Sequence, residues 1–438
     1  MILHDSLFLN NVINKRRCNW QEMPNRFHIR NKSLSRNLLF CLPHATQAPA
    51  EKVAMALQKL QVTYEFLSGR MKMNEETGRL EFDCNNAGVG FVVASSGRSL
   101  DEIGDLVYPN PAFEQLVTKT LESLSPGSHP LCIVQMTSFK CGGFVMAVQT
   151  NHATFDGLSF KHFLQNLGAI AGDKPLAVTP SNDRELLAAR SPPRVTFPHP
   201  ELLNLNTALG QEAQSSPNVF DNSTSDLDFK AFHLSPDDLS DLKAKANAGP
   251  TSGKARITGF NVVSAHIWRC KALSFDSEDN QQRYSTLLYA VDIRRRLSPP
   301  LPAEFAGNAV LTAYATAKCG DIEDAPLSRL AEMVAEGGAR MTDEYARSAI
   351  DWGELNKGFP NGEFLISSWW RLGFNEVEYP WGKPKYSCPL VYRRKDIILL
   401  FPDIEDGSAD SGNAGGVNVL VALPHKEMVK FESLFYKF

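Results

Sequence analysis

The stretch "GFVMAVQTNHATFDGLSFKHFLQNLGAIAG", residues 143–172, changes its pattern of apolar residues at its middle. The part before His152 is a short apolar run of the kind that forms a buried strand. After Asp156 the apolar residues recur at helical spacing and stop at a glycine. They are Leu158, Phe163, Leu164, Leu167 and Ile170. The sequence therefore predicts a strand that passes directly into a helix, with His152 and Asp156 at the junction.

The run "LCIVQMTSF", residues 131–139, predicts a second strand, and the "KCGG" that follows it predicts a hairpin turn. Side chains at the end of a strand emerge from a rigid support, which favours catalytic chemistry there. A histidine can accept a proton near neutral pH, because its unperturbed pKa is about 6.5. His152 and Asp156 alone would also fit a surface histidine followed by a helix-capping aspartate, so the motif needs support from the rest of the chain.

Composition excludes several classes of protein. The chain has 438 residues, of which 43% are hydrophobic and 21% charged, as is usual for a soluble protein with room for two domains. A net charge of −4 disfavours nucleic acid as a partner, and no apolar run is long enough to span a membrane. The start lacks the pattern of a secretory signal, so we expect a cytoplasmic protein. The 8 cysteines show no CxxC and no zinc-ligand spacing, which predicts free thiols and no metal site.

The pattern of helices and strands fades from about residue 176 to 225, where Pro, Ser and Asn are frequent. We interpret this stretch as a long crossover between two domains. The N-terminal domain, residues 1–175, then carries the His152 motif. The C-terminal domain, residues 226–438, again alternates predicted helices and strands.

Two further motifs support a catalytic interpretation. "HATFDG" is followed by "VDIRRR" at residues 291–296 and by "EYPWGKP" at residues 378–384. In this order and separation they resemble the plant BAHD acyltransferases, and the likeness extends over nearly the whole chain, including "EFAGNAV" at residues 304–310. The resemblance implies an α/β fold of two chloramphenicol-acetyltransferase-like domains, each a mixed sheet flanked by helices, joined by a long crossover loop. It also implies a monomer that uses acyl-CoA as a co-substrate and no cofactor.

The resemblance implies a catalytic set of His152, Asp156 and Trp381. His152 would deprotonate the acceptor, which attacks the thioester of acyl-CoA, and would return the proton to the leaving sulfur. Asp156 would point away from the reacting centre and pair with Arg294, so that both shape the site. The indole N–H of Trp381 would stabilise the tetrahedral oxyanion.

The remaining site residues are implied in the same way. Glu378 and Gly382 would support the turn of the family's DFGWG motif, which reads "EYPWG" here. The proline in this variant fixes φ near −65° and removes an N–H, so the turn cannot use a positive φ at that position. Two residues would bind acyl-CoA and two would line the acceptor pocket. They are Lys254 and Thr258 for the donor, and Ser367 and Trp369 for the acceptor. We expect His162, His266 and Trp268 to be packing residues.

The leading hypothesis is an acyl-CoA-dependent O-acyltransferase that esterifies a plant metabolite alcohol, with a hydroxycinnamoyl or other aromatic acyl group. The same base would serve an amine, so an N-acyltransferase is the alternative within the same chemistry. A second alternative is a non-catalytic accessory protein of fatty acyl or wax elongation. A thioester hydrolase is disfavoured, because the sequence contains no GxSxG elbow. Replacing His152 distinguishes a catalytic protein from an accessory one.

Overall fold

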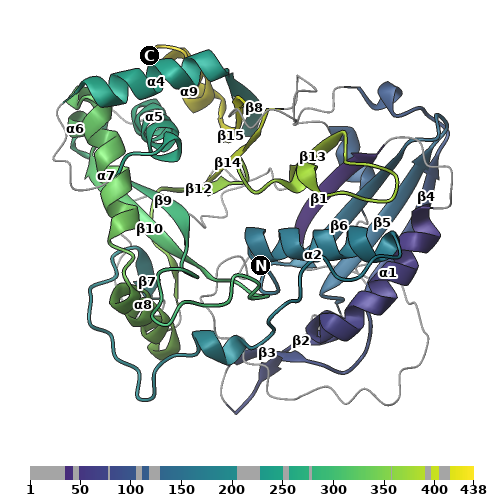
Figure 1. Cartoon of the computed structure of the whole chain (residues 1–438). Coiled ribbons are helices and arrows are strands. Elements are labelled where there is room, and N and C mark those ends of the chain that lie inside the picture. Colours follow the sequence, from purple (N-terminus) through teal and green to yellow (C-terminus); the bar gives the residue numbers. More distant parts are fainter. Residues whose placement is uncertain are drawn as a thin grey trace. The chain divides into compact units, whose positions relative to one another are not determined.

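The computed structural model describes residues 35–42, 49–76, 79–104, 111–117, 129–204, 227–249, 256–275, 279–356, 358–389, 396–403 and 415–438. These residues form two compact units, each assembled from segments that are distant in the sequence. Unit 1 takes its residues from 1–191, 300–309 and 372–391, and unit 2 from 192–299, 310–371 and 392–438. Each unit contains one larger sheet, a two-stranded sheet and its own helices (Figure 1).

The sheet of unit 1 has five strands in the order β13-β1-β6-β5-β4. They are β1 (Ser35–Leu42), β4 (Gly90–Ser96), β5 (Cys132–Phe139), β6 (Phe144–Asn151) and β13 (Tyr386–Pro389). All neighbours are antiparallel except β4 and β5, which are parallel. The hairpin of β5 and β6 and the helix α2 (Gly157–Ala171) confirm the strand, turn, strand and helix predicted for residues 131–172. Unit 1 also contains α1 (Pro49–Thr63) and a hairpin of β2 (Arg70–Asn74) with β3 (Arg79–Asp83).

An aromatic cluster fixes the start of α2 within unit 1. Phe155, inside the "HATFDG" motif, is fully buried and lies with its ring centroid 5.5 Å from Phe66 and 5.5 Å from Phe163. Tyr64 approaches Phe163 edge-on at 5.4 Å. Because such rings bury a large apolar area each, the cluster anchors the turn between His152 and Asp156 to the core.

The sheet of unit 2 has six strands in the order β10-β9-β12-β14-β15-β8. They are β8 (Leu227–Leu234), β9 (Tyr284–Asp292), β10 (Val310–Lys318), β12 (Phe364–Ser368), β14 (Ile397–Pro402) and β15 (Val417–Pro424). β12 is parallel to both of its neighbours and the other pairs are antiparallel, so the sheet is mixed. Its helices are α4 (Pro236–Ala248), α5 (Gly259–Ser274), α6 (Cys319–Asp324), α7 (Leu327–Ala339), α8 (Asp343–Leu355) and α9 (His425–Phe435). The predicted fold class, mixed sheets flanked by helices, is confirmed.

The boundaries of the units differ from a division at residues 175 and 226. Residues 300–309 and 372–391 were expected in the C-terminal domain, but both segments pack in unit 1. β13 pairs with β1 from Leu38 opposite Pro389 to Cys41 opposite Tyr386. Without β13, β1 would be an edge strand with unpaired backbone groups, so this exchange completes the sheet.

The expected crossover, residues 176–225, is ordered over the part that the structure describes, which ends at residue 204. It includes the 3₁₀ helix η5 (Arg184–Leu187) and the short strand β7 (Leu202–Asn204), which pairs with β11 (Gly358–Pro360). Within the described parts of this stretch, the chain is therefore anchored by backbone hydrogen bonds rather than being a free linker.

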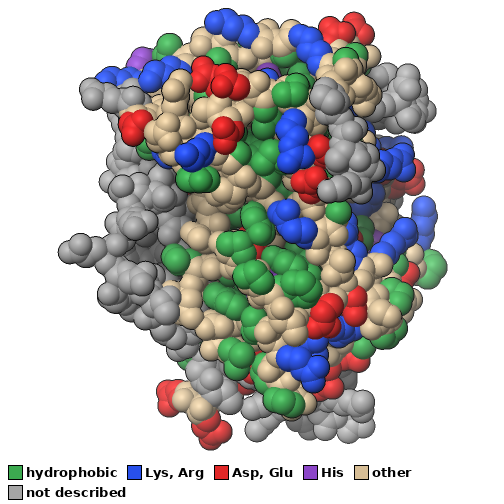
Figure 2. Space-filling view, turned by 90° about the vertical axis from the view of Figure 1, so that its left-hand side faces the viewer, with side chains coloured by type: hydrophobic (Ala, Val, Ile, Leu, Met, Phe, Trp, Pro, Cys, Tyr) green, Lys and Arg blue, Asp and Glu red, His purple; other side chains and the backbone are tan. Residues whose placement is uncertain are grey.

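The described helices and surface add two observations. None of the helices in the described ranges is long and apolar enough to cross a lipid bilayer. On the face shown in Figure 2, Lys and Arg side chains are interspersed with Asp and Glu, and hydrophobic side chains gather near its middle. Charges of both signs on one face largely cancel at a distance, so this face presents no extended field of a single sign.

Candidate active site

His152 lies on a short turn between β6 and α2. Asn151 ends the strand, and its side-chain oxygen accepts a hydrogen bond of 2.9 Å from the backbone N–H of Ala153. On the other side, the side-chain amide of Asn308 donates to the backbone carbonyl of His152 at 2.7 Å. His152 itself is half-buried. The backbone that carries the imidazole is therefore held by polar side chains before and beside it.

Asp156 is buried at the N-cap of α2 and forms a capping box with Ser159. One carboxylate oxygen accepts from the backbone N–H and the hydroxyl of Ser159, both at 2.9 Å. The other accepts from the backbone N–H of Ala309 at 2.9 Å. These bonds occupy three of about four acceptor positions of the carboxylate. Asp156 thus organises the helix N-terminus, where its negative charge is also favourable.

Residues 304–309 form the second side of this turn, although they lie about 150 residues away in the sequence. The carbonyl of Gly307 accepts from the hydroxyl of Ser159 at 2.9 Å and from the backbone N–H of Asp156 at 3.3 Å. Together with the bonds of Asn308 and Ala309, this ties the "EFAGNAV" segment to the "HATFDG" motif within unit 1. The two motifs that the sequence placed far apart therefore build one local structure.

Arg184 also supports the turn. Its guanidinium donates to the carbonyl of Thr154 at 2.9 Å and to that of Ala306 at 3.1 Å, and lies 4.6 Å from the ring centroid of Phe66. Burial lowers the pKa of Arg184 to about 10, against the opposing effect of the negative charge of Glu65. The group remains protonated at neutral pH, so it places a positive charge beneath the motif.

Sequence reasoning missed Arg184, Ser159 and Asn308. Ser159 had a signal, because an aspartate followed three residues later by a hydroxyl residue has the spacing of a capping box. Asn308 lies in "EFAGNAV", a segment that contributed to the resemblance to the family but indicated no role for a single residue. Arg184 had no signal, because it lies in the stretch interpreted as a crossover.

Arg294 lies in unit 2, where its side chain is buried and pairs with Asp292 at 3.2 Å. It is therefore not one of three solvated arginines at a strand end. Asp156 belongs to unit 1, so the ion pair expected between Asp156 and Arg294 joins residues of different units. That pair stays a prediction.

The "EYPWG" motif forms a tight turn in unit 1. The backbone N–H of Gly382 donates to the carbonyl of Tyr379 at 2.9 Å, and the reverse bond is 3.2 Å. Pro380 follows Tyr379, at the second position of the turn, where a fixed φ near −65° is suitable. The positive φ of the turn, +106°, falls on Gly382. The proline variant is therefore compatible with the turn, and Glu378 and Gly382 lie in or beside it, as expected of supporting residues.

The oxyanion role predicted for Trp381 is wrong, because the indole lies beside the start of β6, whereas His152 follows the end of this strand. Its ring packs edge-on against Phe144 with the centroids 5.3 Å apart, and its buried N–H has no hydrogen-bond partner among the described residues. Phe144 begins β6, whereas His152 follows its end, roughly 25 Å away along the strand. A donor to the oxyanion must lie about 3 Å from it, so Trp381 cannot serve a reaction at His152.

The packing of helix α2 independently places the EYPWG turn away from His152. Gly168 lies so close to the EYPWG turn that a Cβ there would come 2.2 Å from the carbonyl oxygen of Glu378. Gly168 is roughly 16 Å along the helix from Gly157. The turn therefore packs against the C-terminal half of α2, and His152 precedes its N-terminus.

Three of the residues expected to bind the substrates, Thr258, Ser367 and Trp369, are described by the structure and lie in unit 2. Ser367 is at the carboxyl end of β12, and Trp369 is buried directly after it. Thr258 is the N-cap of α5, and its hydroxyl forms a capping box with Asn261. Position 259, next to Thr258, lies close to Arg371, with 3.9 Å between a Cβ placed there and the guanidinium. The assignments of Thr258, Ser367 and Trp369 to substrate binding stay predictions, and Lys254 lies outside the described residues.

His162, His266 and Trp268 were expected to be packing residues, and they differ in how far they are buried. Trp268 is fully buried in unit 2 and donates to the hydroxyl of Ser285 at 3.0 Å. His266 is buried, and its Nε2 bonds the carbonyl of Phe435 at 2.7 Å. Both therefore pack as predicted. His162 is half-buried on α2.

Comparison with known proteins identifies the family. The family described as "Transferase family" matches residues 34–438 of this chain. The chain belongs to this family, the BAHD acyltransferases. The protein "Acyltransferase GLAUCE" of Arabidopsis thaliana is 57% identical, over 88% of this chain and 84% of that protein. The acyltransferase class predicted from the motifs is thereby confirmed.

More distant relatives include other acyltransferases. An omega-hydroxypalmitate O-feruloyl transferase of Arabidopsis thaliana is 31% identical, over 91% of this chain and 85% of that protein. A hydroxycinnamoyl-CoA:5-hydroxyanthranilate N-hydroxycinnamoyltransferase of Avena sativa is also 31% identical, over 89% and 87% of the two chains. The crystal structure of vinorine synthase shares the fold, with a TM-score of 0.68 at 22% identity over 94% of this chain and 95% of that one.

This BAHD acyltransferase also contains a buried arrangement that looks like a hydrolytic triad. In unit 2, Nε2 of His199 lies 2.9 Å from the hydroxyl of Ser348, and Nδ1 lies 2.9 Å from a carboxylate oxygen of Glu201. Ser348, however, is fully buried and its oxygen accepts from the backbone N–H groups of Thr196 (2.9 Å) and Phe197 (3.2 Å). A nucleophile needs access and a free lone pair. The three side chains therefore anchor residues 196–201 to α8.

Proposed function

We propose that this protein transfers a hydroxycinnamoyl or related aromatic acyl group from its CoA thioester to the hydroxyl group of a plant metabolite alcohol. The observation that carries the proposal is His152, held by its backbone at the end of a rigid strand with its side chain half-buried. The names of two relatives support the acyl group, since feruloyl is itself a hydroxycinnamoyl group. The proposal takes acyl-CoA as a co-substrate, without a cofactor, and a monomer acting in the cytoplasm.

In the proposed reaction, the neutral imidazole of His152 accepts the proton of the acceptor hydroxyl. The oxygen attacks the thioester carbonyl, so that a C–O bond forms and a tetrahedral intermediate results. When the intermediate collapses, the C–S bond breaks and the sulfur takes the proton back from His152. The products are an ester and free CoA, with no change of oxidation state. General-base assistance of this kind contributes about 10² to 10⁴ in rate.

No covalent acyl-enzyme is required if the site holds both substrates in reacting geometry beside the base, because positioning alone removes much of the barrier. The neighbours of His152 would supply this positioning. Asn308 and Arg184 hold the backbone of the turn, and Asp156 fixes the start of α2. Asp156 differs from the aspartate of a hydrolytic triad, since its carboxylate is bonded to Ser159 and Ala309.

For the substrates, we propose that Lys254 and Thr258 contact the CoA moiety, and that Ser367 and Trp369 line the acceptor site. Backbone N–H groups at the start of α5 suit an anionic group such as a phosphate. An amine acceptor is the second candidate, because the relative from Avena sativa is named as an N-acyltransferase and the same base would serve it.

The test is the His152→Ala variant of the full chain, assayed with a panel of acyl-CoA donors against mixed alcohols and amines and followed by mass spectrometry. We expect kcat to fall by about 10² to 10⁴, because the general base is lost, while CoA binding is retained. His162→Ala is the matched control, since it removes another half-buried histidine, which lies on α2 shortly after the motif. Its kcat should stay within about twofold of the unaltered protein.

Each other outcome is informative. An unchanged kcat in His152→Ala would remove the general-base role. Turnover that yields only amides would favour the amine acceptor. A protein that binds CoA but transfers no acyl group from any donor would instead support the accessory role in fatty acyl or wax elongation.

A further inference from the structure

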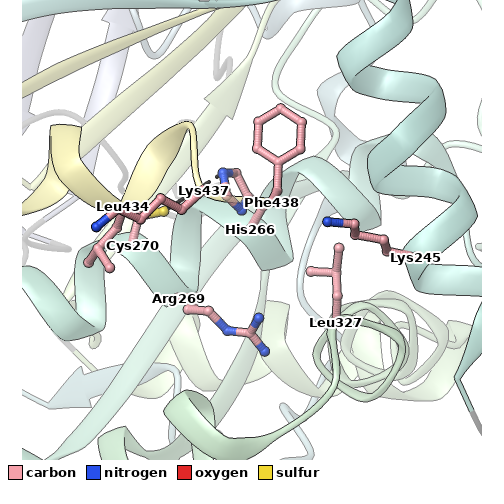
Figure 3. A pocket seen from close by; sticks show the side chains of 8 residues that line it. All are labelled: Lys245, His266, Arg269, Cys270, Leu327, Leu434, Lys437 and Phe438. Atoms are coloured by element: carbon pink, nitrogen blue, oxygen red, sulfur yellow. Dashed lines mark hydrogen bonds between the residues drawn. The ribbon is translucent and has the colours of Figure 1, made fainter.

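A pocket of about 300 Å³ lies in unit 2, where α4, α5, the start of α7 and the C-terminal end of α9 meet (Figure 3). Its volume is at the lower end of the range for small-molecule sites, about 300 to 1,000 Å³. None of the residues assigned above to acyl transfer lines it. The eight lining residues are Lys245, His266, Arg269, Cys270, Leu327, Leu434, Lys437 and Phe438.

The charged side chains of the pocket all carry the same sign. Lys245 comes from α4, Arg269 from α5, and Lys437 follows α9. None of them forms an ion pair with a carboxylate of the described residues, and no acidic residue lines the pocket. Figure 3 shows the ammonium group of Lys245 and the guanidinium of Arg269 directed into the space beside Leu327 and Phe438. Cations that form no ion pair attract an anion.

Arg269 is held in place before any ligand binds. Its Nε donates to the carbonyl of Ile322 at 3.1 Å, and one terminal nitrogen donates to the carbonyl of Ala325. The other terminal nitrogen has no hydrogen-bond partner among the described residues. Because the guanidinium is planar and already oriented, binding an anion costs little further ordering of this side chain.

The remaining lining groups are neutral at neutral pH. Burial lowers the pKa of His266 to about 4, and the positive charges of Arg269 and Lys245 add to this effect. Burial raises the pKa of the Cys270 thiol to about 12. The other walls are the side chains of Leu327, Leu434 and Phe438. The pocket therefore joins a cationic rim to an apolar interior.

We propose that this pocket binds a small organic acid, with its carboxylate against Lys245 and Arg269 and an apolar body against Leu434 and Phe438. The ammonium group of Lys437 points to the other side of the pocket, past Leu434 (Figure 3). An arginine matches a carboxylate through two parallel N–H groups, and buried apolar area adds affinity for the body. Aromatic and aliphatic acids share this chemistry, and the experiment distinguishes them. The site does not depend on the acyl-transfer reaction proposed above.

The test is isothermal titration of the purified full chain with ferulate as the aromatic probe and octanoate as the aliphatic one. Acetate serves as an acid without an apolar body, and coniferyl alcohol as an aromatic body without the charge. We expect at least one of the two acids to bind at least tenfold more tightly than acetate and coniferyl alcohol. The acid that binds more tightly identifies the class of ligand.

Charge reversal locates the site. The variant Lys245→Glu should weaken binding of that acid at least tenfold. The control Lys59→Glu reverses one exposed lysine outside the pocket with the same change in net charge, and should leave binding unaltered. If Lys245→Glu does not melt cooperatively, Lys245→Gln and Lys59→Gln replace both variants. Binding of neither acid, an equal loss in both variants, or equal binding of coniferyl alcohol would overturn the proposal.

Discussion

At the scale of the residue, the acidic member of the HxxxD motif is explained by its hydrogen bonds. Asp156 is buried, and a buried carboxylate without partners would be costly. Ser159 and Ala309 supply the donors, so the charge is compensated by the helix start and by a segment from the second half of the chain. The motif therefore combines His152, which we propose as the base, with an aspartate that supports the turn carrying it.

Trp381 provides a test of the geometry of unit 1. In the Trp381→Phe variant a ring still packs against Phe144 and Tyr379. We expect kcat to change by less than about threefold, because the indole lies at the far end of β6 from His152. Loss of an oxyanion donor would instead lower kcat by about 10² to 10³. Steady-state kinetics of the two proteins side by side decides between these outcomes.

His266 makes the stability of unit 2 depend on pH. Its pKa is lowered to about 4 in the folded protein and is about 6.5 in an unfolded chain. The unfolded state therefore binds the proton first, so stability is full above pH 6.5 and is lost as the pH falls toward 4. From this group we expect a loss of about 2 kcal/mol between pH 7 and pH 5.

Urea unfolding at these two pH values measures the effect, with His266→Gln as the comparison. Other titrating groups act equally in both proteins, so the difference between their pH dependences isolates His266. The unaltered protein should lose more stability on acidification than the variant. Equal losses in the two proteins would contradict the lowered pKa.

At the scale of the element, the segment of residues 304–309 acts on the turn that carries His152. Removing the amide in Asn308→Ala frees the backbone carbonyl of His152 from a bond of 2.7 Å. We expect kcat to fall by about 10- to 100-fold, because small displacements of a base are costly, while KM for acyl-CoA changes little. Initial-rate kinetics over a range of both substrates measures the two parameters.

The control is Asn361→Ala, which removes a similar bond elsewhere. The side chain of Asn361 donates to the carbonyl of Pro200 at 3.0 Å in unit 2. This variant should keep its kcat. If both variants lose activity equally, the effect of Asn308 would reflect general destabilisation rather than the position of His152.

At the scale of the whole molecule, unit 1 is built from three separated segments. Residues 1–191 expressed alone lack β13 and residues 304–309. β1 then loses one of its two neighbours, and Asp156 loses the N–H of Ala309. We expect this fragment to aggregate, because it exposes a strand edge and a partly unpaired buried carboxylate.

A fragment in which the missing segments are restored tests whether their loss causes the aggregation. Residues 300–309 and 372–391 joined to 1–191 through Gly/Ser linkers restore the missing strand and the missing N–H. The repaired fragment should be soluble and show a cooperative melt by circular dichroism, whereas 1–191 alone should elute as an aggregate in size-exclusion chromatography. A monomeric, cooperatively folded 1–191 fragment would show that the inserted segments are dispensable.

Local residue patterns predicted the elements around the motif and indicated the family. The change from an apolar run to helical spacing around His152 predicted β6 and α2, because the side-chain period of each element is fixed by its backbone geometry. The turn of EYPWG was also accessible, since proline and glycine have few permitted conformations. The order of three short motifs was enough to indicate the BAHD acyltransferases.

The contacts between distant segments became visible only in the folded chain. It placed Trp381 at the opposite end of β6 from His152, and it brought Asn308, Ala309 and Arg184 to the HxxxD turn. Local patterns carry no information on such contacts, because pairing between segments about 150 residues apart depends on the sheet order and on burial in the assembled core. For the same reason the sequence placed residues 300–309 and β13 with the second half of the chain, whereas the sheet of unit 1 requires them.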